Sequence, residues 1–385
     1  MRQKLIDVAK LAGVGHATVD RVLNQRGGVK PATAKKVIEA ARELGVDRKL
    51  PSIYRQGLRF EVLLGRRQIP LCARMSDAFV RAGRPFEDIV AVERTFVDDT
   101  KPEALAQAIL KSRSNALIVY GQEHELVVDA IAEVTSAGKP VVTIVSDVPS
   151  APRYGYVGID HYKAGRCAAF FLSRMASEGT AILLCSDLSY RAHAERVSGC
   201  RDGLDQYSGG RLVTELIEAS ERDVLANQHL LDMLSGTNIA GIYCASANHP
   251  TLHRLLARKS IARPSVLIGH DLSGETERLL RDGTMTLVID QNPDLQVRKA
   301  LVTLALRFGL AGALPEETTV PFTIHVSDNI ACLAANRVRN SMHVMIGEGN
   351  PSTYPWDRAW HLIGVGQGSC GICGCSSARL TGRHE

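Results

Sequence analysis

Residues 7–24 read DVAKLAGVGHATVDRVLN, and this stretch decides the fold of the N-terminal part of the chain. The spacing of its apolar residues predicts a first helix over residues 6–12, which Gly13 ends. A second helix is predicted over residues 16–23, directly after a turn formed by residues 13–15. Two short helices joined by a three-residue turn that contains glycine are typical of a helix-turn-helix.

A third helix is predicted to brace the first two. Pro31 stands in its first turn, its body covers residues 34–44, and Gly45 follows as the stop residue. Its predicted buried stripe is Val37, Ile38, Ala41 and Leu44. The predicted inward residues are Ile6, Ala9 and Leu11 in the first helix, and Val19, Val22 and Leu23 in the second. The residues left to face outward from the second helix are His16, Ala17, Asp20 and Arg21.

Positive charge is concentrated in this part of the chain. Residues 1–59 hold 13 Lys and Arg against 5 Asp and Glu, whereas residues 60–385 hold 33 against 36. The net charges are therefore +8 and −3. A basic head on a mildly acidic body indicates a nucleic-acid-binding module joined to another domain. A solvated basic face is the alternative, and the helical pattern favours the nucleic-acid-binding module.

The stretch 7–24 closely resembles the head of the LacI/GalR family of bacterial transcription regulators. The resemblance continues through residues 29–33, which match the V-x-x-x-T step of that family into its third helix. It implies an all-α head over residues 1–46 that binds double-stranded operator DNA.

The resemblance also implies roles for single residues of the head. Base edges would be read in the major groove by His16, Ala17 and Arg21, and an arginine can bond guanine O6 and N7 together. The groups implied to position phosphates are Thr18, Asn24, Lys30 and Thr33. Relatives follow the third helix with a hinge helix. Residues 47–59 take that place here and contain Pro51, so whether a hinge helix forms is open.

From Phe60 onward, apolar strand patterns alternate with helix patterns at the intervals of βαβ units. The predicted strands cover residues 60–64, 116–120, 141–145, 181–185, 241–244, 265–269 and 286–290. The predicted helices cover residues 103–112, 123–137, 163–176, 194–204, 224–234 and 276–281. Buried parallel strands with helices on both faces give doubly wound α/β domains, which bind ligands at the carboxyl ends of their strands.

This body resembles the periplasmic-binding-protein type 1 architecture, which is also the body of the LacI/GalR family. The stretches that carry the resemblance are residues 141–147, 156–160, 269–271 and 279–284. It implies an N-terminal subdomain over residues 60–158 and 291–326, and a C-terminal subdomain over residues 159–290.

Six polar residues lie where those predicted strands end or where the helices after them begin. They are Asp147, Asp160, Arg196, Asn248, Asp271 and Gln291. In sugar-binding members of the family, residues at these positions hydrogen-bond ligand hydroxyls, and carboxylates, amides and an arginine suit a polyol. The resemblance therefore implies an effector site in the interdomain cleft. Taken singly, each residue has a helix cap or a turn residue as its alternative interpretation.

The composition of the chain, with 385 residues of which 45% are hydrophobic, excludes collagen-like and membrane classes. No stretch approaches the ~20 apolar residues of a membrane helix. Because the start lacks the apolar region of a secretory signal, we expect a cytoplasmic protein. Residues 333–385 do not resemble the family. They contain Cys370, Cys373 and Cys375, whose spacing is compatible with Zn or Cu(I), but we expect a poorly ordered extension and no bound metal or cofactor.

These patterns predict a transcription regulator, most simply a repressor, that works as a homodimer and responds to a small sugar or polyol. The alternative is a solute-binding protein for sugar uptake, against which the basic helix-turn-helix argues. An enzyme is not expected, because the sequence has no nucleophile elbow, P-loop or H-E-x-x-H pattern.

Overall fold

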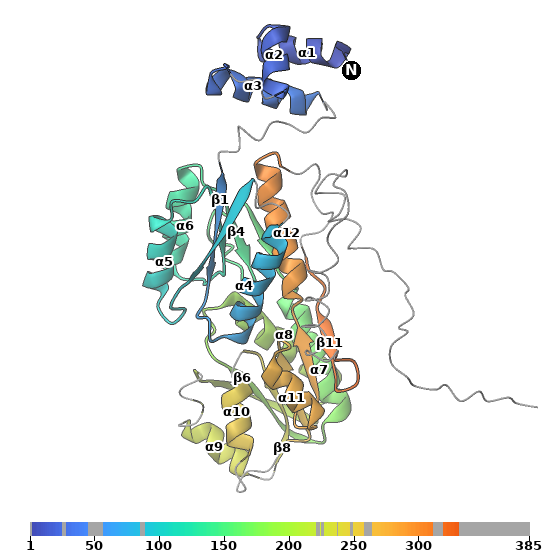
Figure 1. Ribbon diagram of the computed structural model, residues 1–385. Coiled ribbons are helices and arrows are strands. Elements are labelled where there is room, and N and C mark those ends of the chain that lie inside the picture. The colour runs from blue at the N-terminus through green and yellow to red at the C-terminus, as the bar shows by residue number, and fades with distance from the viewer. Residues whose placement is uncertain are drawn as a thin grey trace, which may run out of the picture. The chain divides into compact units, whose positions relative to one another are not determined.

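A computed structural model gives the structure of the chain (Figure 1). It describes residues 2–24, 28–44, 57–84, 89–220, 224, 227–236, 238–246, 249–257, 264–310 and 319–330. Residues 47–56 of the predicted hinge over residues 47–59, the effector residue Asn248 and the cysteines of the tail lie outside these residues, and the last two hinge residues belong to a strand that begins at Leu58.

The head is a bundle of helices α1 (Arg2–Ala12), α2 (His16–Leu23) and α3 (Pro31–Glu43). Gly13 ends α1 with a φ of +65°, a conformation that glycine adopts without strain. The predicted inward residues of α2 are buried, and Val37, Ile38 and Ala41 of α3 are buried with them. In α1 the prediction was partly wrong. Ile6 and Leu11 are 39% and 49% exposed, and the buried residues are Val8, Ala9 and Ala12.

The corrected face of α1 follows from helix geometry. Residues three or four apart share one side of a helix, so Val8 and Ala12 align with each other. Ile6 and Leu11 lie on the flanks of that stripe. Val8 then packs in one cluster with Val19 and Val37, which joins the three helices.

The first sheet of the body is parallel and has the strand order β2-β1-β3-β4-β5. Its strands are β1 (Leu58–Leu64), β2 (Val90–Phe96), β3 (Ala116–Val119), β4 (Val141–Ile144) and β5 (Gly155–Val157). Helices α4 (Pro70–Gly83) and α12 (Pro293–Arg307) cover one face, and α5 (Pro102–Lys111) and α6 (Glu125–Ser136) cover the other. Successive side chains of β1 point to opposite faces of the sheet, so Val62 packs toward α4 and Leu63 packs toward α5.

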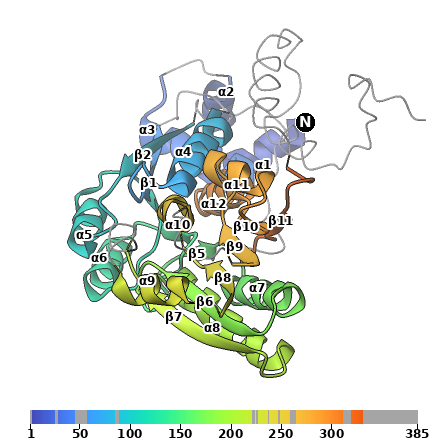
Figure 2. The same ribbon diagram turned by 90° about the horizontal axis from the view of Figure 1, so that it is seen from below.

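The second sheet has the strand order β11-β10-β9-β8-β6-β7. Its strands are β6 (Gly179–Cys185), β7 (Leu212–Glu218), β8 (Ile239–Cys244), β9 (Val266–His270), β10 (Leu287–Asp290) and β11 (Thr323–His325). Helices α7 (His161–Met175) and α8 (Arg191–Tyr207) cover one face. The other face is covered by α9 (Gln228–Ser235), α10 (His249–Leu256) and α11 (Gly274–Arg281), as Figure 2 shows.

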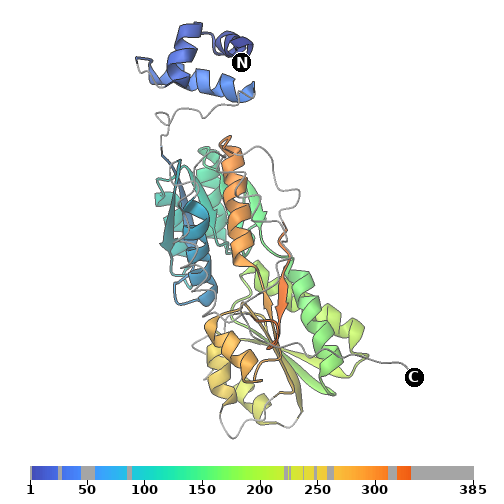
Figure 3. The ribbon, with the colours of Figure 1, turned by 45° about the vertical axis from the view of Figure 1, so that its right-hand side comes forward.

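We call the first sheet with α4, α5, α6 and α12 the first lobe, and the second sheet with α7 to α11 the second lobe. The chain passes between the lobes after β5, after β10 and again before β11 (Figure 3). The predicted extent of the first subdomain was too long at its end. Thr323–His325 pairs antiparallel with β10 and so belongs to the second sheet.

The predicted fold class, an all-α head on an α/β body with two doubly wound parallel sheets, is confirmed. Four strands were not predicted, namely β2, β5, β7 and β11. Two of them, β2 and β7, lie at sheet edges and are only partly buried, so they lack the continuous apolar run of a central strand. The other two have only three residues each.

Candidate functional site

The head carries its predicted DNA-facing residues on the outer side of α2. His16, Ala17 and Arg21 are exposed, whereas Val19, Val22 and Leu23 fill the core behind them. Helix α2 begins after Gly15, and no side chain caps its N-terminus. This face therefore offers one cation, one imidazole and uncapped backbone N–H groups, which suit the edge of a nucleic acid.

The residues predicted to position phosphates lie around this face. Lys30 is exposed, and Thr18, Asn24 and Thr33 are partly buried. The Asn24 side-chain amide donates to the Asp20 carboxylate at 2.6 Å, so Asp20 faces Asn24 within the helix.

In the body, three of the predicted effector residues meet at the carboxyl ends of strands. Asp271 directly follows β9, Gln291 directly follows β10, and Arg196 projects from α8. Gln291 Nε2 donates to both carboxylate oxygens of Asp271, at 2.9 and 3.0 Å. Arg196 is 2% exposed and Gln291 is 1% exposed, while Asp271 is partly accessible.

Arg196 is held by two hydrogen bonds inside the second lobe. Its Nη1 donates to the carbonyl oxygen of Ala245 at 2.8 Å, and its Nε donates to His161 Nδ1 at 3.2 Å. Its Nη2 is buried and has no hydrogen-bond partner among the described residues. The same holds for Gln291 Oε1, and for the hydroxyl of Ser246, which follows β8.

Burial and nearby charges shift the pKa of Asp271. Burial raises the pKa of Asp271 to about 6, although the nearby Arg196 guanidinium opposes this shift. The neighbouring Asp290 carboxylate adds to the rise, while the hydrogen bond from Gln291 lowers the pKa. A partner that donates hydrogen bonds to Asp271 would favour its ionised form.

An aromatic pair joins the two lobes. Tyr120 follows β3 of the first lobe, and its ring centroid lies 5.6 Å from that of Tyr190 in the second lobe. Burial raises the pKa of Tyr120, the charge of Arg196 lowers it, and the charge of Asp271 raises it further. The Tyr190 hydroxyl donates to the backbone carbonyl of Asp99 in the first lobe at 2.9 Å.

Two other predicted effector residues have structural partners of their own. Asp147 accepts hydrogen bonds from Thr143 Oγ1, the Val148 N–H and Arg153, which fix the turn after β4. Asp160 caps the N-terminus of α7, where it accepts from the Lys163 N–H at 2.8 Å. The structure therefore brings together Arg196, Asp271 and Gln291. The carboxylates of Asp147 and Asp160 instead accept hydrogen bonds from their own neighbours in the chain.

Several residues of this region were not predicted from the sequence. Arg74 of α4 pairs with Asp290 at the end of β10, and His161 contacts Arg196. Asp290 could have been predicted, because it is a carboxylate at the end of a predicted apolar strand, as Asp271 is. Arg74 lies in a helix that was not predicted, and its partner is distant in the sequence.

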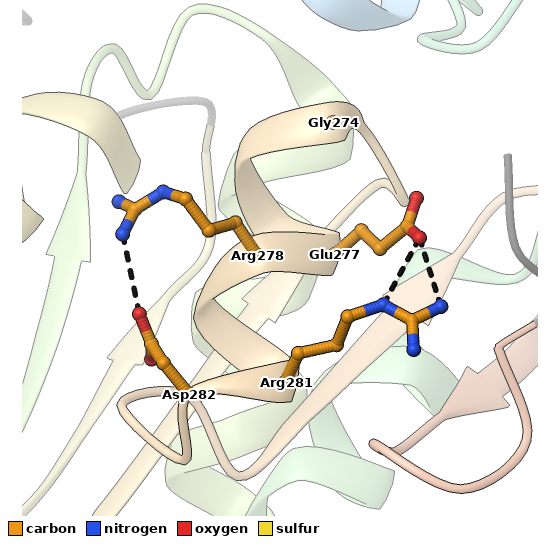
Figure 4. Close-up of a pocket in the computed structure, with 5 residues that line it drawn as sticks. All are labelled: Gly274, Glu277, Arg278, Arg281 and Asp282. Atoms are coloured by element: carbon orange, nitrogen blue, oxygen red, sulfur yellow. Dashed lines mark hydrogen bonds and ion pairs between the residues drawn. The ribbon is translucent and has the colours of Figure 1, made fainter. Parts of the chain in front are cut away.

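A hollow of about 380 Å³ lies on α11 (Figure 4), and none of the predicted effector residues lines it. It is lined by Gly274, Glu277, Arg278, Arg281 and Asp282. Arg281 pairs with Glu277 at 2.9 Å, and Arg278 pairs with Asp282 at 3.2 Å. The charged residues that line the hollow are therefore paired with one another. A second hollow of about 520 Å³ lies on the head, between α1 and the start of α2.

In the part of the chain that the structure describes, no three His, Cys, Asp or Glu side chains gather in a way that could hold a metal ion. None of the helices in this part of the chain is long and apolar enough to cross a membrane.

Both the head and the body of the chain match known protein families. Residues 4–46 match the bacterial regulatory proteins of the lacI family, and residues 60–307 match the periplasmic binding protein domain. A glucose-galactose binding protein from Geobacillus stearothermophilus, GanP, has the same fold as the body, with a TM-score of 0.62 at 21% identity. That alignment covers 72% of this chain and all of GanP.

Two curated relatives are transcription regulators by name. The HTH-type transcriptional regulator DegA of Bacillus subtilis is 26% identical over 218 residues, which are 54% of this chain and 62% of DegA. A sucrose operon repressor of Vibrio alginolyticus is 56% identical over 41 residues, 11% of this chain and 44% of that protein. The matched regions thus span less than two thirds of either relative. The head of the chain matches the lacI family of bacterial regulatory proteins, and the chain belongs to the proteins with a periplasmic binding protein domain.

Proposed function

We propose that the chain is a transcriptional repressor whose affinity for operator DNA is controlled by a small sugar or polyol bound at the strand ends of the two lobes. The observation that carries the proposal is the set of buried polar atoms without partners among the described residues, Arg196 Nη2, Gln291 Oε1 and Ser246 Oγ. Buried polar groups without partners are costly in a protein alone, so such a set is typical of a binding site.

The chemistry of these atoms points to hydroxyl groups. Arg196 Nη2 can only donate, Gln291 Oε1 can only accept, and the Ser246 hydroxyl can do both. A sugar hydroxyl both donates and accepts, so it can bond each of these three kinds of atom. The tyrosine pair Tyr120 and Tyr190, which joins the two lobes, would supply an apolar surface for the sugar ring. The names of GanP and of the sucrose operon repressor support the same class of ligand.

The DNA side of the proposal rests on the head. We propose that His16, Ala17 and Arg21 read bases, and that Thr18, Asn24, Lys30 and Thr33 hold phosphates. One head makes only a few base contacts, so two heads of a homodimer would bind a palindromic operator with higher effective concentration. Such a regulator would act in the cytoplasm and would catalyse no reaction.

Within the body, Arg196, Asp271 and Gln291 carry the ligand proposal. Asp147, Asp160 and Asn248 stay predictions, and the first two would have to exchange their present partners to bind a ligand. Sugar binding would control DNA binding by linkage, because a ligand that prefers one arrangement of the lobes shifts the population toward it.

A thermal-shift screen tests the ligand class. D-glucose, D-galactose and sucrose are the first probes, followed by pentoses and polyols, and a sugar that binds the folded protein raises its melting temperature. DNA selected from a random pool by the protein tests the head, since phosphate contacts make binding weaken steeply with salt. A sugar that binds without any DNA binding would favour the solute-binding alternative. DNA binding without any sugar or polyol response would overturn the ligand class.

A further inference from the structure

A single histidine links the proposed ligand residue Arg196 to the backbone of the first lobe. His161 is the first residue of α7 and is 2% exposed. Its Nδ1 lies 3.2 Å from Arg196 Nε, and its Nε2 lies 2.6 Å from the carbonyl oxygen of Val145, just after β4. One ring therefore touches a side chain of the second lobe and a carbonyl of the first.

The donors and acceptors fix the tautomer of this ring. The Arg196 Nε–H can only donate, so His161 Nδ1 must accept and carries no proton. The Val145 carbonyl can only accept, so His161 Nε2 must carry the proton. Burial and the adjacent Arg196 lower the pKa of His161 well below its ordinary value, which keeps the imidazole neutral.

The carbonyl that accepts from His161 belongs to a strained turn. Val145 has a φ of +68°, which is rare for a β-branched residue. The Ser146 N–H donates to the Ile144 carbonyl at 2.8 Å, so Val145 is the central residue of a γ-turn with positive φ, a rare form. The Tyr156 hydroxyl also donates to the Val145 carbonyl, at 3.0 Å.

This turn contacts the second lobe at one further point. The Ala192 N–H at the start of α8 donates to the Ser146 hydroxyl at 3.3 Å, and α8 also carries Arg196. The strained turn and the arginine are thus connected twice, through His161 and through the start of α8.

We propose that His161 is a positioning residue: in its Nε2-protonated form it orients the Arg196 guanidinium with Nη2 toward the ligand, and it couples that guanidinium to the Val145 turn of the first lobe. This inference rests on the proposed sugar site and deepens it, since His161 itself touches no ligand. When Arg196 engages a sugar, the change in its hydrogen bonds reaches the first lobe through this ring.

The first experiment needs no ligand. Histidine labelled with ¹⁵N in the full chain gives separate nitrogen signals for each tautomer, and the His161→Phe variant assigns the signal of His161. The result expected is an Nε2-protonated neutral ring that does not titrate near neutral pH. An Nδ1-protonated ring, or a mixture of tautomers, would overturn the proposal whether or not any sugar binds.

The second experiment compares three variants in sugar binding and in the effect of sugar on DNA binding. His161→Phe keeps the ring volume and removes both hydrogen bonds, and His161→Gln keeps one donor and one acceptor. The matched control is His193→Phe. His193 is a buried histidine too, but it lies on α8, and its ring bonds the Asp187 carbonyl at 2.8 Å.

With D-glucose, D-galactose and sucrose as probes, we expect His161→Phe to weaken sugar binding by about tenfold or more, as loss of a hydrogen bond to a charged group does. His161→Gln should restore most of the affinity, and His193→Phe should keep it. If a sugar binds the wild type and His161→Phe equally well, the role of His161 is wrong and the sugar site stands. If no probe binds the wild type, the sugar site is in question and the tautomer measurement alone decides the role of His161.

Discussion

Arg74 of the first lobe and Asp290 of the second form a two-point ion pair between α4 and the end of β10. Arg74 Nη1 lies 2.5 Å from Asp290 Oδ1, and Nη2 lies 3.3 Å from Oδ2. Arg74 Nη1 also donates to the Leu272 carbonyl at 2.5 Å, and Asp290 accepts from the Leu272 N–H at 2.9 Å. Burial opposes ionisation of Asp290, but the bound Arg74 outweighs it and holds the pKa of Asp290 below its ordinary value. This ion pair therefore stabilises the contact between the two lobes.

Replacing Arg74 with methionine should destabilise the body. The change leaves the Asp290 carboxylate, which is 7% exposed, without its cation. Loss of one partner of a buried pair is costly, and because about a third of Arg74 is exposed we expect about 2–3 kcal/mol of unfolding free energy. Urea unfolding of the ligand-free protein measures this.

Arg81→Met is the matched control for that variant. Arg81 also lies on α4 and pairs with Asp294 at 2.6 Å, but both side chains are 46% exposed. An exposed pair contributes little, so the control should lose well under about 1 kcal/mol. Equal losses in the two variants would show that the Arg74 pair has no special role.

Asp271→Asn should change how stability depends on pH. The pKa of Asp271 is about 6 in the folded protein and 3.8 in a model compound, so the folded state holds its proton more tightly. This stabilisation is fully present at pH values below the pKa of Asp271 in the unfolded state, and it is lost as the pH rises toward about 6. At about pH 7 the variant should therefore be more stable than the wild type by about 3 kcal/mol, and at about pH 4 the difference should be under about 1 kcal/mol. Unfolding of both proteins across this range gives the difference, and a constant difference would contradict the assignment.

Arg21→Ala should weaken specific DNA binding and relax the preference at one base pair of each half-site. The expected cost is ~1–3 kcal/mol for a lost bidentate contact to a base. Lys30→Ala should instead weaken binding to every sequence alike and flatten the dependence on salt. Anisotropy titrations with selected and scrambled DNA separate the two effects. If Arg21→Ala leaves the ratio of the two affinities unchanged, Arg21 does not read a base.

The sequence predicted elements best where a single local signal determines them. The turn at residues 13–15 and the apolar runs of β3, β4 and β6 specify their own conformation through glycine and through full burial. The same local logic predicted that Asp271 and Gln291 follow strands at one edge of a sheet, where the structure has them, and their binding of a ligand stays a prediction.

What the sequence could not predict depends on contacts between distant residues. Asp160 has the same local pattern as Asp271, but it caps α7 because its carboxylate reaches the Lys163 N–H. Arg74 finds Asp290 only after two sheets have formed. The role of His161 is likewise invisible in the sequence, since Arg196 lies 35 residues away along the chain.

The most direct test of the account is the effect of sugar on DNA binding in the wild type and in Arg196→Ala. The dissociation constant for selected DNA is measured with and without a sugar that stabilises the wild type in the thermal screen. We predict that the sugar changes this constant at least about fivefold for the wild type, as is usual for coupled sites. Arg196→Ala should bind the DNA with nearly wild-type affinity and show no response to the sugar. An Arg196→Ala protein that keeps the full sugar response, or a wild type whose DNA affinity no bound sugar alters, would contradict the account.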